Sequence, residues 1–430
     1  MPKNNPRILV LSSLSPSIGP AITGAQIYEA LKRKGLDVDF MTKYPEPGHP
    51  DYLWVLEKKS IKNYFCRVIT RLRWFIVGGK TKEAGYYFSY AHEKWPPVPT
   101  KFVVNAIRKQ YDLVLIVFWQ ELLSFKTVEH IYDKLKCQIQ FAAVDFSHMS
   151  GGCHFPNNCQ RYKTGCGKCP AFHSKKEIDF TAQNVRYRKR FYEKVKPIIG
   201  GNSYMKQFYD QSYLLKDVRQ CIGMQPIIDT DVFYPIDRKL LRIKYEIPES
   251  KQFIILFGCQ KLSDERKGLK YLIDSFRLLY EMLGRETDKV LVIAVGKKFD
   301  TIKEDIPFVS RDLGYVPMDQ LPELYSLATC FVCPSVNDAG PMMVNQSLCC
   351  GTPVVGFDMG AVKQVVKNKG TGICVPLRDS QALAEGILKV MKMTKDEYQI
   401  MSANARRVAL ETSSFDVHAN NVLSVYEMYK

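Results

Sequence analysis

Two polar segments of the chain are candidates for binding a phosphorylated ligand. The first is Asp264-Glu265-Arg266-Lys267-Gly268, between an expected strand at 253–257 and an expected helix at 269–283. Arg266 and Lys267 would stand where helix N–H groups and the helix dipole already favour an anion. This indicates a diphosphate site, although a solvated charge run at a helix start explains the same residues. The segment lacks the Gly-Lys-Ser/Thr of a Walker motif, so it does not indicate an NTPase.

The second polar segment runs from Pro334 to Pro341, directly before an expected helix at 342–350. Ser335, Asn337 and Asp338 are all residue types that cap helices, and Pro341 suits the first helical position. A purely structural cap needs one such residue rather than three. We therefore expect this loop to present polar groups to a ligand.

Four of the thirteen cysteines are crowded into 17 positions: Cys153, Cys159, Cys166 and Cys169. Four thiolates can enclose one Zn²⁺, and the final Cys-x₂-Cys is a common half-site, although the first pair is spaced widely. His154 could replace one of the four. We expect a structural Zn²⁺ here, with reduced packing cysteines as the alternative. The other nine lie in hydrophobic segments, so the chain has no disulfide framework.

The elements that must position these segments alternate between strands and helices in both halves. A strand at 8–11, a glycine-bearing loop, a helix at about 24–34 and a strand at 36–40 form a βαβ unit with a parallel sheet. Further strands are expected at 113–118, 139–144, 198–199, 253–257, 290–295, 330–333 and 353–357, and further helices at 269–283, 321–327 and 342–350. The pattern predicts an α/β protein with two Rossmann-like parallel-sheet domains facing across a cleft, with their boundary near 202–236.

The order of four motifs resembles the family-4 glycosyltransferases of the GT-B fold. Residues 336–357 (VNDAGPMMVNQSLCCGTPVVGF) resemble the family's donor-binding segment, and Thr23-Gly24-Ala25 resembles its Gly-Gly-Ala. Residues 229–235 (DTDVFYP) resemble the start of its second domain, and Arg266-Lys267-Gly268 its phosphate-binding segment. The resemblance covers nearly the whole chain and includes the Cys-rich insert of a subset of these enzymes. It implies transfer with retention of configuration, with the diphosphate stabilised by cations and a helix dipole, so that no cofactor is required for catalysis.

By this resemblance the second domain holds a nucleotide-sugar donor. Lys267 and Arg266 would bind its diphosphate, Gly314-Tyr315-Val316 would lie near the base, and the Asp338 loop would contact the sugar hydroxyls. The residues assigned to donor binding are Gly24, Arg266, Lys267, Tyr315, Val316, Asp338, Ala339, Gly340, Pro341 and Gln346.

The sequence departs from the family pattern in two places. Where the family carries two Glu residues separated by seven positions, this chain has Asp338 and Gln346. A carboxylate can accept from both ribose hydroxyls, whereas a carboxamide accepts from one through its oxygen and donates to the other through its NH2, which should cost about 1 kcal/mol of binding free energy. Many relatives place a His directly before Asp after the strand at 139–144, whereas this chain has Asp145-Phe146-Ser147-His148. We expect Asp338, His148 and Asp145 to serve catalysis. The alternatives are that His148 is solvated or structural, or that His154 takes its place.

The two halves of the chain differ in charge. Residues 1–200 hold 32 Lys+Arg against 16 Asp+Glu, while residues 201–430 hold 29 against 28, which indicates an anionic partner for the first half. Apolar residues between Ile61 and Ile76 recur on one helical face, bordered by Lys62, Arg67, Arg71 and Arg73. We expect residues 61–77 to face an anionic lipid surface, with docking on the Rossmann sheet as the alternative.

These observations define the expected organisation. The domains are an acceptor-binding domain at 1–200 with a Cys-rich insert at 150–172, a nucleotide-sugar domain at 201–412, and a helix at 413–430 that crosses back to the first. No apolar run reaches the ~18 residues of a membrane-spanning helix, and the first residues lack a secretory signal, so we expect a cytoplasmic protein peripheral on the inner face of the membrane.

The function that we expect is hexosyl transfer from a nucleotide-sugar to a saccharide or lipid-linked saccharide acceptor, as in surface-polysaccharide assembly. One alternative is a non-catalytic scaffold that binds a nucleotide-sugar or a partner. Another is a basic zinc-containing nucleic-acid-binding protein. Beyond Arg161-Tyr162-Lys163, aromatic and basic residues are not interleaved around the cysteines, which argues against nucleic acid.

Overall fold

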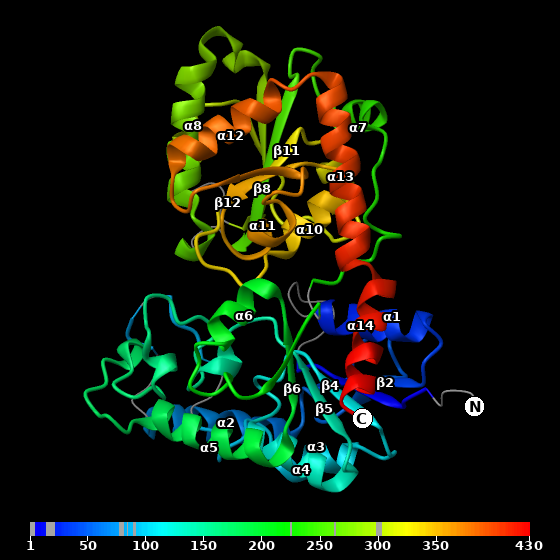
Figure 1. Cartoon of the computed structure of the whole chain (residues 1–430), viewed down its shortest axis with the longest axis vertical. Coiled ribbons are helices and arrows are strands. Elements are labelled where there is room, and N and C mark those ends of the chain that lie inside the picture. The colour runs from blue at the N-terminus through cyan, green and yellow to red at the C-terminus, as the bar shows by residue number, and fades with distance from the viewer. Residues whose placement is uncertain are drawn as a thin grey trace. The chain divides into compact units, whose positions relative to one another are not determined.

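The computed structural model describes residues 5–13, 22–76, 81–83, 85–88, 92–223, 226–261, 264–297 and 303–430. The chain divides into two compact units, of which the first comprises Met1–Ile227 with His418–Lys430 and the second Ile228–Val417. Each unit is built on its own parallel sheet (Figure 1). The expected boundary at residue 200 falls inside the first sheet, because strands β6 (Ile198–Gly201) and β7 (Arg219–Ile222) pair there. The boundary between the units lies between Ile227 and Ile228, within the range 202–236 expected from the strand and helix pattern.

The first sheet has the strand order β3-β2-β1-β4-β5-β6-β7, and all neighbours are parallel. Its other strands are β1 (Ile8–Leu11), β2 (Val38–Thr42), β3 (Leu53–Trp54), β4 (Leu113–Ile116) and β5 (Gln138–Ala142). Every residue of β1 and β4 is buried, because helices cover both faces of such a sheet.

The α-helices of the first unit follow the strands in chain order. They are α1 (Ile22–Arg33), α2 (Ile61–Ile76), α3 (Thr100–Ala106), α4 (Phe125–Leu135), α5 (Phe180–Val195) and α6 (Ser203–Tyr209). Short 3₁₀ turns η2 (Ser147–Met149), η3 (Arg161–Lys163) and η4 (Pro170–Phe172) lie in the segment that holds the clustered cysteines. The last helix, α14 (Phe415–Met428), returns to this unit, where Gln138 Nε2 donates to Tyr426 O at 3.2 Å.

The second sheet has the order β10-β9-β8-β11-β12-β13, again with all neighbours parallel. Its strands are β8 (Phe253–Lys261), β9 (Val290–Lys297), β10 (Ser310–Asp312), β11 (Cys330–Cys333), β12 (Val354–Phe357) and β13 (Gly372–Val375). Its α-helices are α7 (Arg238–Lys244), α8 (Leu269–Leu283), α9 (Leu321–Leu327), α10 (Met342–Cys349), α11 (Gly360–Val365), α12 (Ser380–Met391) and α13 (Lys395–Ser413), with 3₁₀ turns η5 (Glu265–Lys267), η6 (Gly284–Lys289) and η8 (Lys303–Asp305). Numbered within the unit, the strand order is 3-2-1-4-5-6, the Rossmann order, so the direction of winding reverses between β8 and β11.

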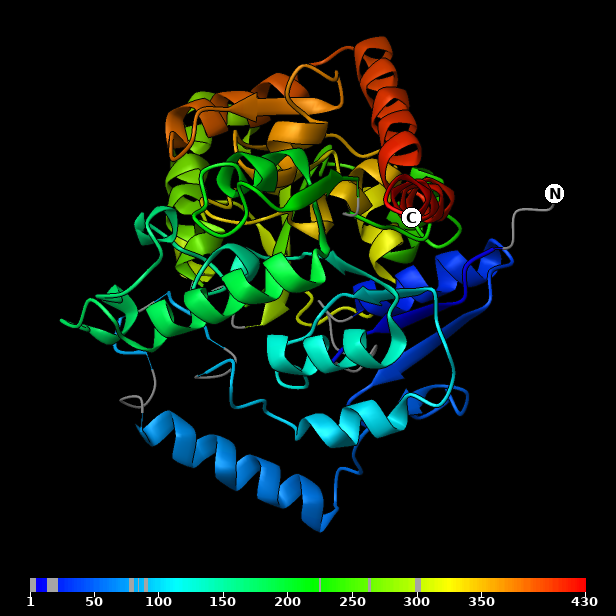
Figure 2. The ribbon, with the colours of Figure 1, turned by 60° about the horizontal axis from the view of Figure 1, so that its bottom comes forward.

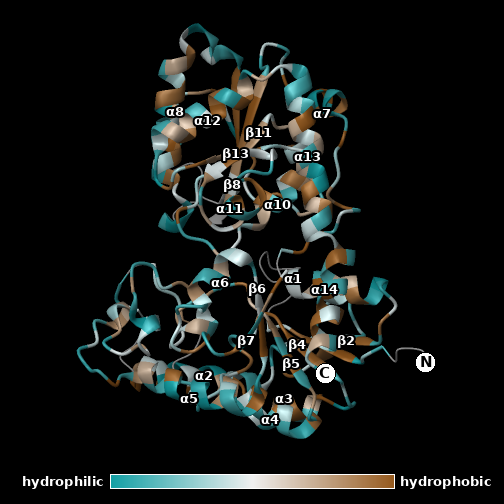
Figure 3. Cartoon of the chain, viewed as in Figure 1, coloured by the Kyte–Doolittle hydropathy of each residue, from teal (hydrophilic) through white to brown (hydrophobic). Residues whose placement is uncertain are grey.

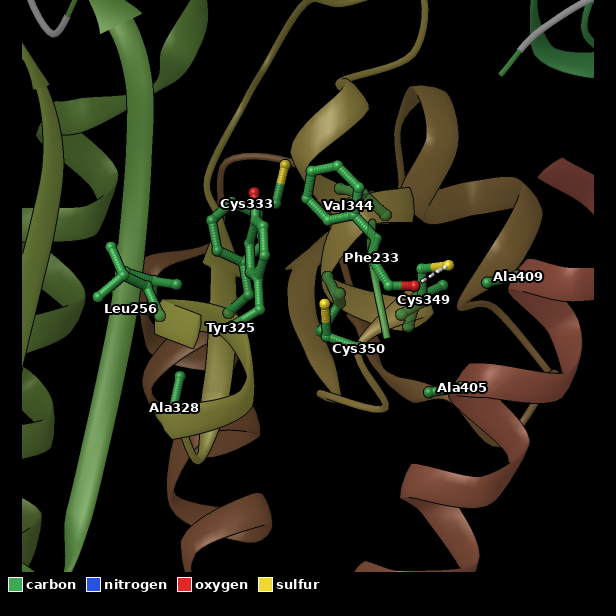
Figure 4. Close-up of a cluster of buried hydrophobic side chains, with 14 of the residues drawn as sticks. Phe233, Leu256, Tyr325, Ala328, Cys333, Val344, Cys349, Cys350, Ala405 and Ala409 are labelled. Atoms are coloured by element: carbon green, nitrogen blue, oxygen red, sulfur yellow. Dashed lines mark hydrogen bonds between the residues drawn. The ribbon is translucent and has the colours of Figure 1, made fainter. Parts of the chain in front are cut away.

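Apolar side chains fill both faces of the second sheet, and apolar residues follow its strands in Figure 3. Figure 4 shows part of one layer, in which Phe233, Tyr325 and Val344 pack together and Cys349 Sγ donates to Phe233 O at 3.2 Å. Cys333, Cys349 and Cys350 are buried in this layer as small apolar residues, as the sequence predicts. In the part of the chain that the structure describes, no helix is long and apolar enough to cross a membrane.

The predicted fold class of two Rossmann-like parallel-sheet units is confirmed. Strands and helices lie where the periodicity places them, with shifts of a few residues at their ends. The facing arrangement of the two domains stays a prediction.

Candidate active site

The two polar segments of the second unit lie at its topological switch point. Strands β8 and β11 are neighbours and run parallel, so the loops that leave their carboxyl ends emerge side by side. The loop after β8 carries Arg266 and Lys267, and the loop after β11 carries Asp338. A crevice at this position is where open α/β sheets bind their ligands.

Backbone contacts lock the two loops together. The N–H of Val336 donates to the carbonyl of Arg266 at 2.8 Å. Gly268 has a φ of 69°, and a Cβ there would lie 1.9 Å from the carbonyl oxygen of Pro334. Only glycine can therefore join the β8 loop to α8 at this close approach.

Each cation of the β8 loop is paired with a carboxylate. Lys267 Nζ donates to Asp338 Oδ2 across the two loops, and Arg266 Nη2 donates to Asp264 Oδ2 at 2.6 Å. Burial disfavours both charges of the first pair, yet the pKa of Asp338 is lowered and that of Lys267 raised, because each charge stabilises the other. Each cation that the sequence places at the start of α8 is therefore neutralised by a carboxylate of the same unit. A diphosphate at this position would meet the Lys267 ammonium beside the Asp338 carboxylate.

The rest of the β11 loop turns directly into α10. Asp338 Oδ1 accepts from the N–H of Gly340 at 3.1 Å, Ala339 is buried, and Pro341 precedes the helix at its N-cap. The Asp338 side chain thereby stabilises the loop that was expected to meet the sugar.

Gln346 lies on α10 and is almost fully buried. Its Oε1 accepts from the Tyr325 hydroxyl at 3.0 Å, and its Nε2 donates to the Met318 thioether at 3.2 Å. Sulfur is a weak acceptor, so the amide nitrogen is the part of this side chain best able to exchange its partner for a ligand. Nothing in the sequence indicated the hydrogen bond from Tyr325. This bond joins α9 to α10, so Gln346 has a structural role that does not depend on ribose binding.

The segment expected near the base follows β10. Gly314 N–H donates to Asp312 Oδ1 at 2.8 Å, which fixes the turn, and Tyr315 is 65% exposed. Val316 instead packs against the hydrophobic core. Of this pair, Tyr315 alone offers an open surface for stacking.

In the first unit, Gly24 lies in α1 and packs on the end of β1. A Cβ at this position would come within 2.8 Å of the Ser12 Cβ. Gly24 thus allows close packing of helix on strand. Residues 14–21 of the expected first loop lie outside the described part of the chain.

Asp145 follows β5 and forms a tight polar cluster at the carboxyl end of the first sheet. His154 Nδ1 lies 2.7 Å from Asp145 Oδ2, the N–H of Ser147 donates to Oδ1 at 2.8 Å, and Gln120 Nε2 reaches Oδ2 at 3.4 Å. Burial alone would raise the pKa of Asp145, but His154 and the Ser147 bonds outweigh it and lower the pKa to about 2. Asp145 is therefore a carboxylate that orients the His154 ring.

His148 does not lie where a catalytic residue would reach a substrate, which corrects our expectation. The ring is 1% exposed and packs among Trp119, Phe125 and Phe141. Burial lowers its pKa to about 3, so the imidazole is neutral. The structural alternative fits His148, and His154 is the histidine that the polar cluster contains.

Two residues that carry no signal in the sequence hold this cluster in place. Arg188 and Glu93 form an ion pair at 2.6 Å with both side chains fully buried. Arg188 Nη1 also donates to the carbonyls of Ser147 and Ser150, and Glu93 Oε2 accepts from the N–H of Phe125 at 2.9 Å. Because 95 residues separate the partners, no local spacing could have revealed the pair.

Cys153, Cys159, Cys166 and Cys169 line one pocket in the first unit. Four successive residues from Gly165 to Lys168 have positive φ, and the N–H of Gly151 donates to Cys166 Sγ at 3.3 Å. Burial, with the neighbouring sulfurs, raises the pKa of Cys153 to about 11 and that of Cys169 to about 12. Among the described residues, no three or more His, Cys, Asp or Glu side chains are placed so that they could hold a metal ion. The zinc site gains no support from these positions and stays a prediction.

The second unit has the strand order of a Rossmann domain, and its polar loops lie at the switch point, where such sheets bind ligands. Residues 237–408 match the family described as "Glycosyl transferases group 1". The chain is 23% identical over 308 residues to an uncharacterized glycosyltransferase of Methanocaldococcus jannaschii. The aligned region covers 69% of this chain and 75% of the relative.

Two further comparisons extend this result. The chain is 22% identical over 217 residues to the N-acetyl-alpha-D-glucosaminyl L-malate synthase of Bacillus anthracis, and the match spans 50% of this chain and about half of that enzyme, 54%. The Anabaena protein HepE, crystallised with UDP and glucose, superposes with a TM-score of 0.64 at 14% identity over 98% of this chain and 100% of its own. Together the comparisons support a GT-B glycosyltransferase.

Proposed function

We propose that this protein transfers a hexose from a nucleotide-diphosphate sugar to a saccharide acceptor, with retention of configuration and without a divalent cation. The observation that carries the proposal is the Lys267–Asp338 pair at the switch point of the domain that matches the glycosyltransferase family. The presence of UDP and glucose in the HepE crystal structure supports a nucleotide-sugar donor here.

The residues of the second unit fit these roles as follows. Lys267 binds the diphosphate beside the N-terminus of α8, where the helix dipole also favours an anion. Asp338 releases Lys267 to the diphosphate and turns to a sugar hydroxyl. Tyr315 stacks on the base, and Gln346 Nε2 meets the ribose. No metal is needed, because Lys267 and the helix N-terminus stabilise the leaving group.

The acceptor belongs to the first unit in this proposal. Asp145 and His154 supply a polar pair at the carboxyl end of its sheet, where a sugar hydroxyl can be bound. The excess of positive charge in residues 1–200 favours an acceptor with a phosphate, such as a lipid-diphosphate-linked saccharide of surface-polysaccharide assembly. The protein would act peripherally on the inner face of the membrane.

A non-catalytic scaffold is the second candidate, and two contacts favour it. Asp338 is held by Lys267, and Gln346 is held by Tyr325, so both departures from the family pattern have partners inside the unit. Such a protein would bind the donor without transferring the sugar.

A thermal-shift screen over nucleotides and nucleotide-sugars tests the proposal. We expect nucleoside diphosphates and one class of nucleotide-sugar to raise the melting temperature, because a ligand that binds only the folded state stabilises it. Release of nucleoside diphosphate on addition of saccharide acceptors then separates the enzyme from the scaffold. The absence of any shift would contradict both.

A further inference from the structure

Helix α2 presents its apolar face to solvent, which is the reverse of an ordinary surface helix. Seven large hydrophobic side chains of this helix are between 39% and 84% exposed: Ile61, Tyr64, Phe65, Ile69, Leu72, Phe75 and Ile76. At 100° per residue they occupy one continuous arc, which we call the apolar face of α2. A contiguous exposed apolar surface of this kind marks an interaction site.

Specific contacts on the opposite face fix the helix in this orientation. Asn63 is buried, where its Oδ1 accepts from the Tyr44 hydroxyl at 3.0 Å and its Nδ2 donates to Lys58 O at 2.7 Å. Cys66 is also buried, and Trp74 stacks on Phe172 at 6.1 Å between ring centroids. The side of α2 opposite its apolar face is therefore the docked one, and the alternative that the apolar face packs on the Rossmann sheet is wrong. Figure 2 shows α2 as the blue helix at the outer edge of the first unit.

The charge around the apolar face has a single sign. Lys62 lies on one flank of the arc, and Arg67 and Arg71 lie on the other, all three exposed. Residues 58–82 contain eight Lys and Arg and no Asp or Glu. Arg73 does not belong to this border, contrary to our expectation, because its Nη1 donates to Pro96 O at 2.9 Å on the docked side.

We infer that α2 is a docking helix that lies in the surface of an anionic membrane. An interfacial helix buries its apolar face among the acyl chains while Lys and Arg on its flanks reach lipid phosphates. A second copy of the chain is a poor occupant, since two such faces would bring Arg67 and Arg71 against like charges. The inference does not rest on the proposed enzymatic function, because vesicle binding is measured without a donor or acceptor.

Sedimentation with vesicles tests this inference. Wild-type protein should pellet with phosphatidylcholine vesicles that contain phosphatidylglycerol and not with phosphatidylcholine alone, and added salt should reduce the pelleting. The Leu72→Ser/Phe75→Ser variant and the Arg67→Glu/Arg71→Glu variant should each bind at least about tenfold more weakly. Thermal unfolding near that of wild type should show that both remain folded, because the replaced side chains are exposed.

Matched controls lie on the second unit. Leu240→Ser/Ile243→Ser removes apolar side chains of α7 that are 64% and 76% exposed, and Arg285→Glu/Lys369→Glu reverses two exposed charges. Both controls should pellet like wild type. The inference is overturned if the α2 variants pellet like wild type, if neutral vesicles bind equally well, or if nothing pellets. It is also overturned if the free protein is a dimer that Leu72→Ser/Phe75→Ser converts to a monomer while pelleting is unchanged.

Discussion

Lys267 and Asp338, 71 residues apart in the chain, form an ion pair between the two loops that leave the switch point of the second sheet. The pair joins the expected phosphate-binding segment to the expected sugar-binding segment. Under the proposed function, the donor diphosphate draws the Lys267 ammonium away from the Asp338 carboxylate. Occupation of the diphosphate site would then free the Asp338 carboxylate.

Replacing Asp338 with Asn tests this coupling. Without its carboxylate partner, Lys267 is available to the diphosphate, so we expect affinity for nucleoside diphosphate to stay equal or rise several-fold. Sugar transfer should fall by at least about tenfold, because the carboxylate that meets the sugar is gone. Titration calorimetry and turnover measured on the same preparation separate the two effects. A large loss of diphosphate affinity would show that Asp338 does not compete for Lys267.

Gln346 offers a test of how the ribose is bound. Gln346→Ala should weaken nucleotide binding roughly fivefold, because a hydrogen bond contributes about 1 kcal/mol. Tyr325→Phe removes the hydroxyl that holds Oε1 and leaves Nε2 in place, so it should reduce stability more than nucleotide affinity. If both variants bind nucleotide like wild type, Gln346 is a packing residue alone.

His148 should control acid stability without serving catalysis. The pKa of about 3 in the folded protein lies below the ordinary 6.5, so the unfolded chain binds the extra proton and stability falls as pH drops through 6.5 toward 3. Between pH 7 and pH 5 the loss is about 2 kcal/mol. His148→Phe should reduce this slope and keep most of the transfer activity. Urea unfolding at several pH values measures how the free energy of unfolding changes with pH. Loss of transfer in folded His148→Phe would restore a catalytic role.

The clustered cysteines permit a direct metal analysis. We expect about one equivalent of Zn²⁺ per chain in protein purified under reducing conditions, and loss of the metal from Cys153→Ser/Cys166→Ser with a lower melting temperature. Cys221→Ser, which does not line the pocket, is the matched control and should keep the metal. If the purified wild-type protein contains no metal and all four thiols can be titrated, the zinc prediction is wrong and the cysteines serve only as packing residues.

Much of the fold could be predicted from the sequence, because the buried strands are short apolar runs bounded by turns. The start of a helix directly after Gly268 could be predicted in the same way, from the local sequence. Its close approach to the Pro334 carbonyl could not, because that contact depends on the loop of a neighbouring strand. Local pattern therefore predicts the elements, and the contacts between their loops come only from the folded unit.

The candidate site shows the same division. The pairing of Lys267 with Asp338 could not be predicted, because it depends on which strands become neighbours. The choice between His148 and His154 also depended on tertiary packing. Only the folded unit places aromatic side chains around the first ring and Asp145 beside the second.

The most direct test of the central claim is titration calorimetry of nucleoside diphosphates in the presence of EDTA. Wild-type protein and Lys270→Ala, which changes an exposed lysine at the start of α8, should bind one nucleoside diphosphate with equal affinity. Lys267→Ala should bind it at least about tenfold more weakly, because a charge-assisted bond to phosphate contributes roughly 1.5–3 kcal/mol. Binding that is unchanged in Lys267→Ala, or that requires Mg²⁺, would contradict the account.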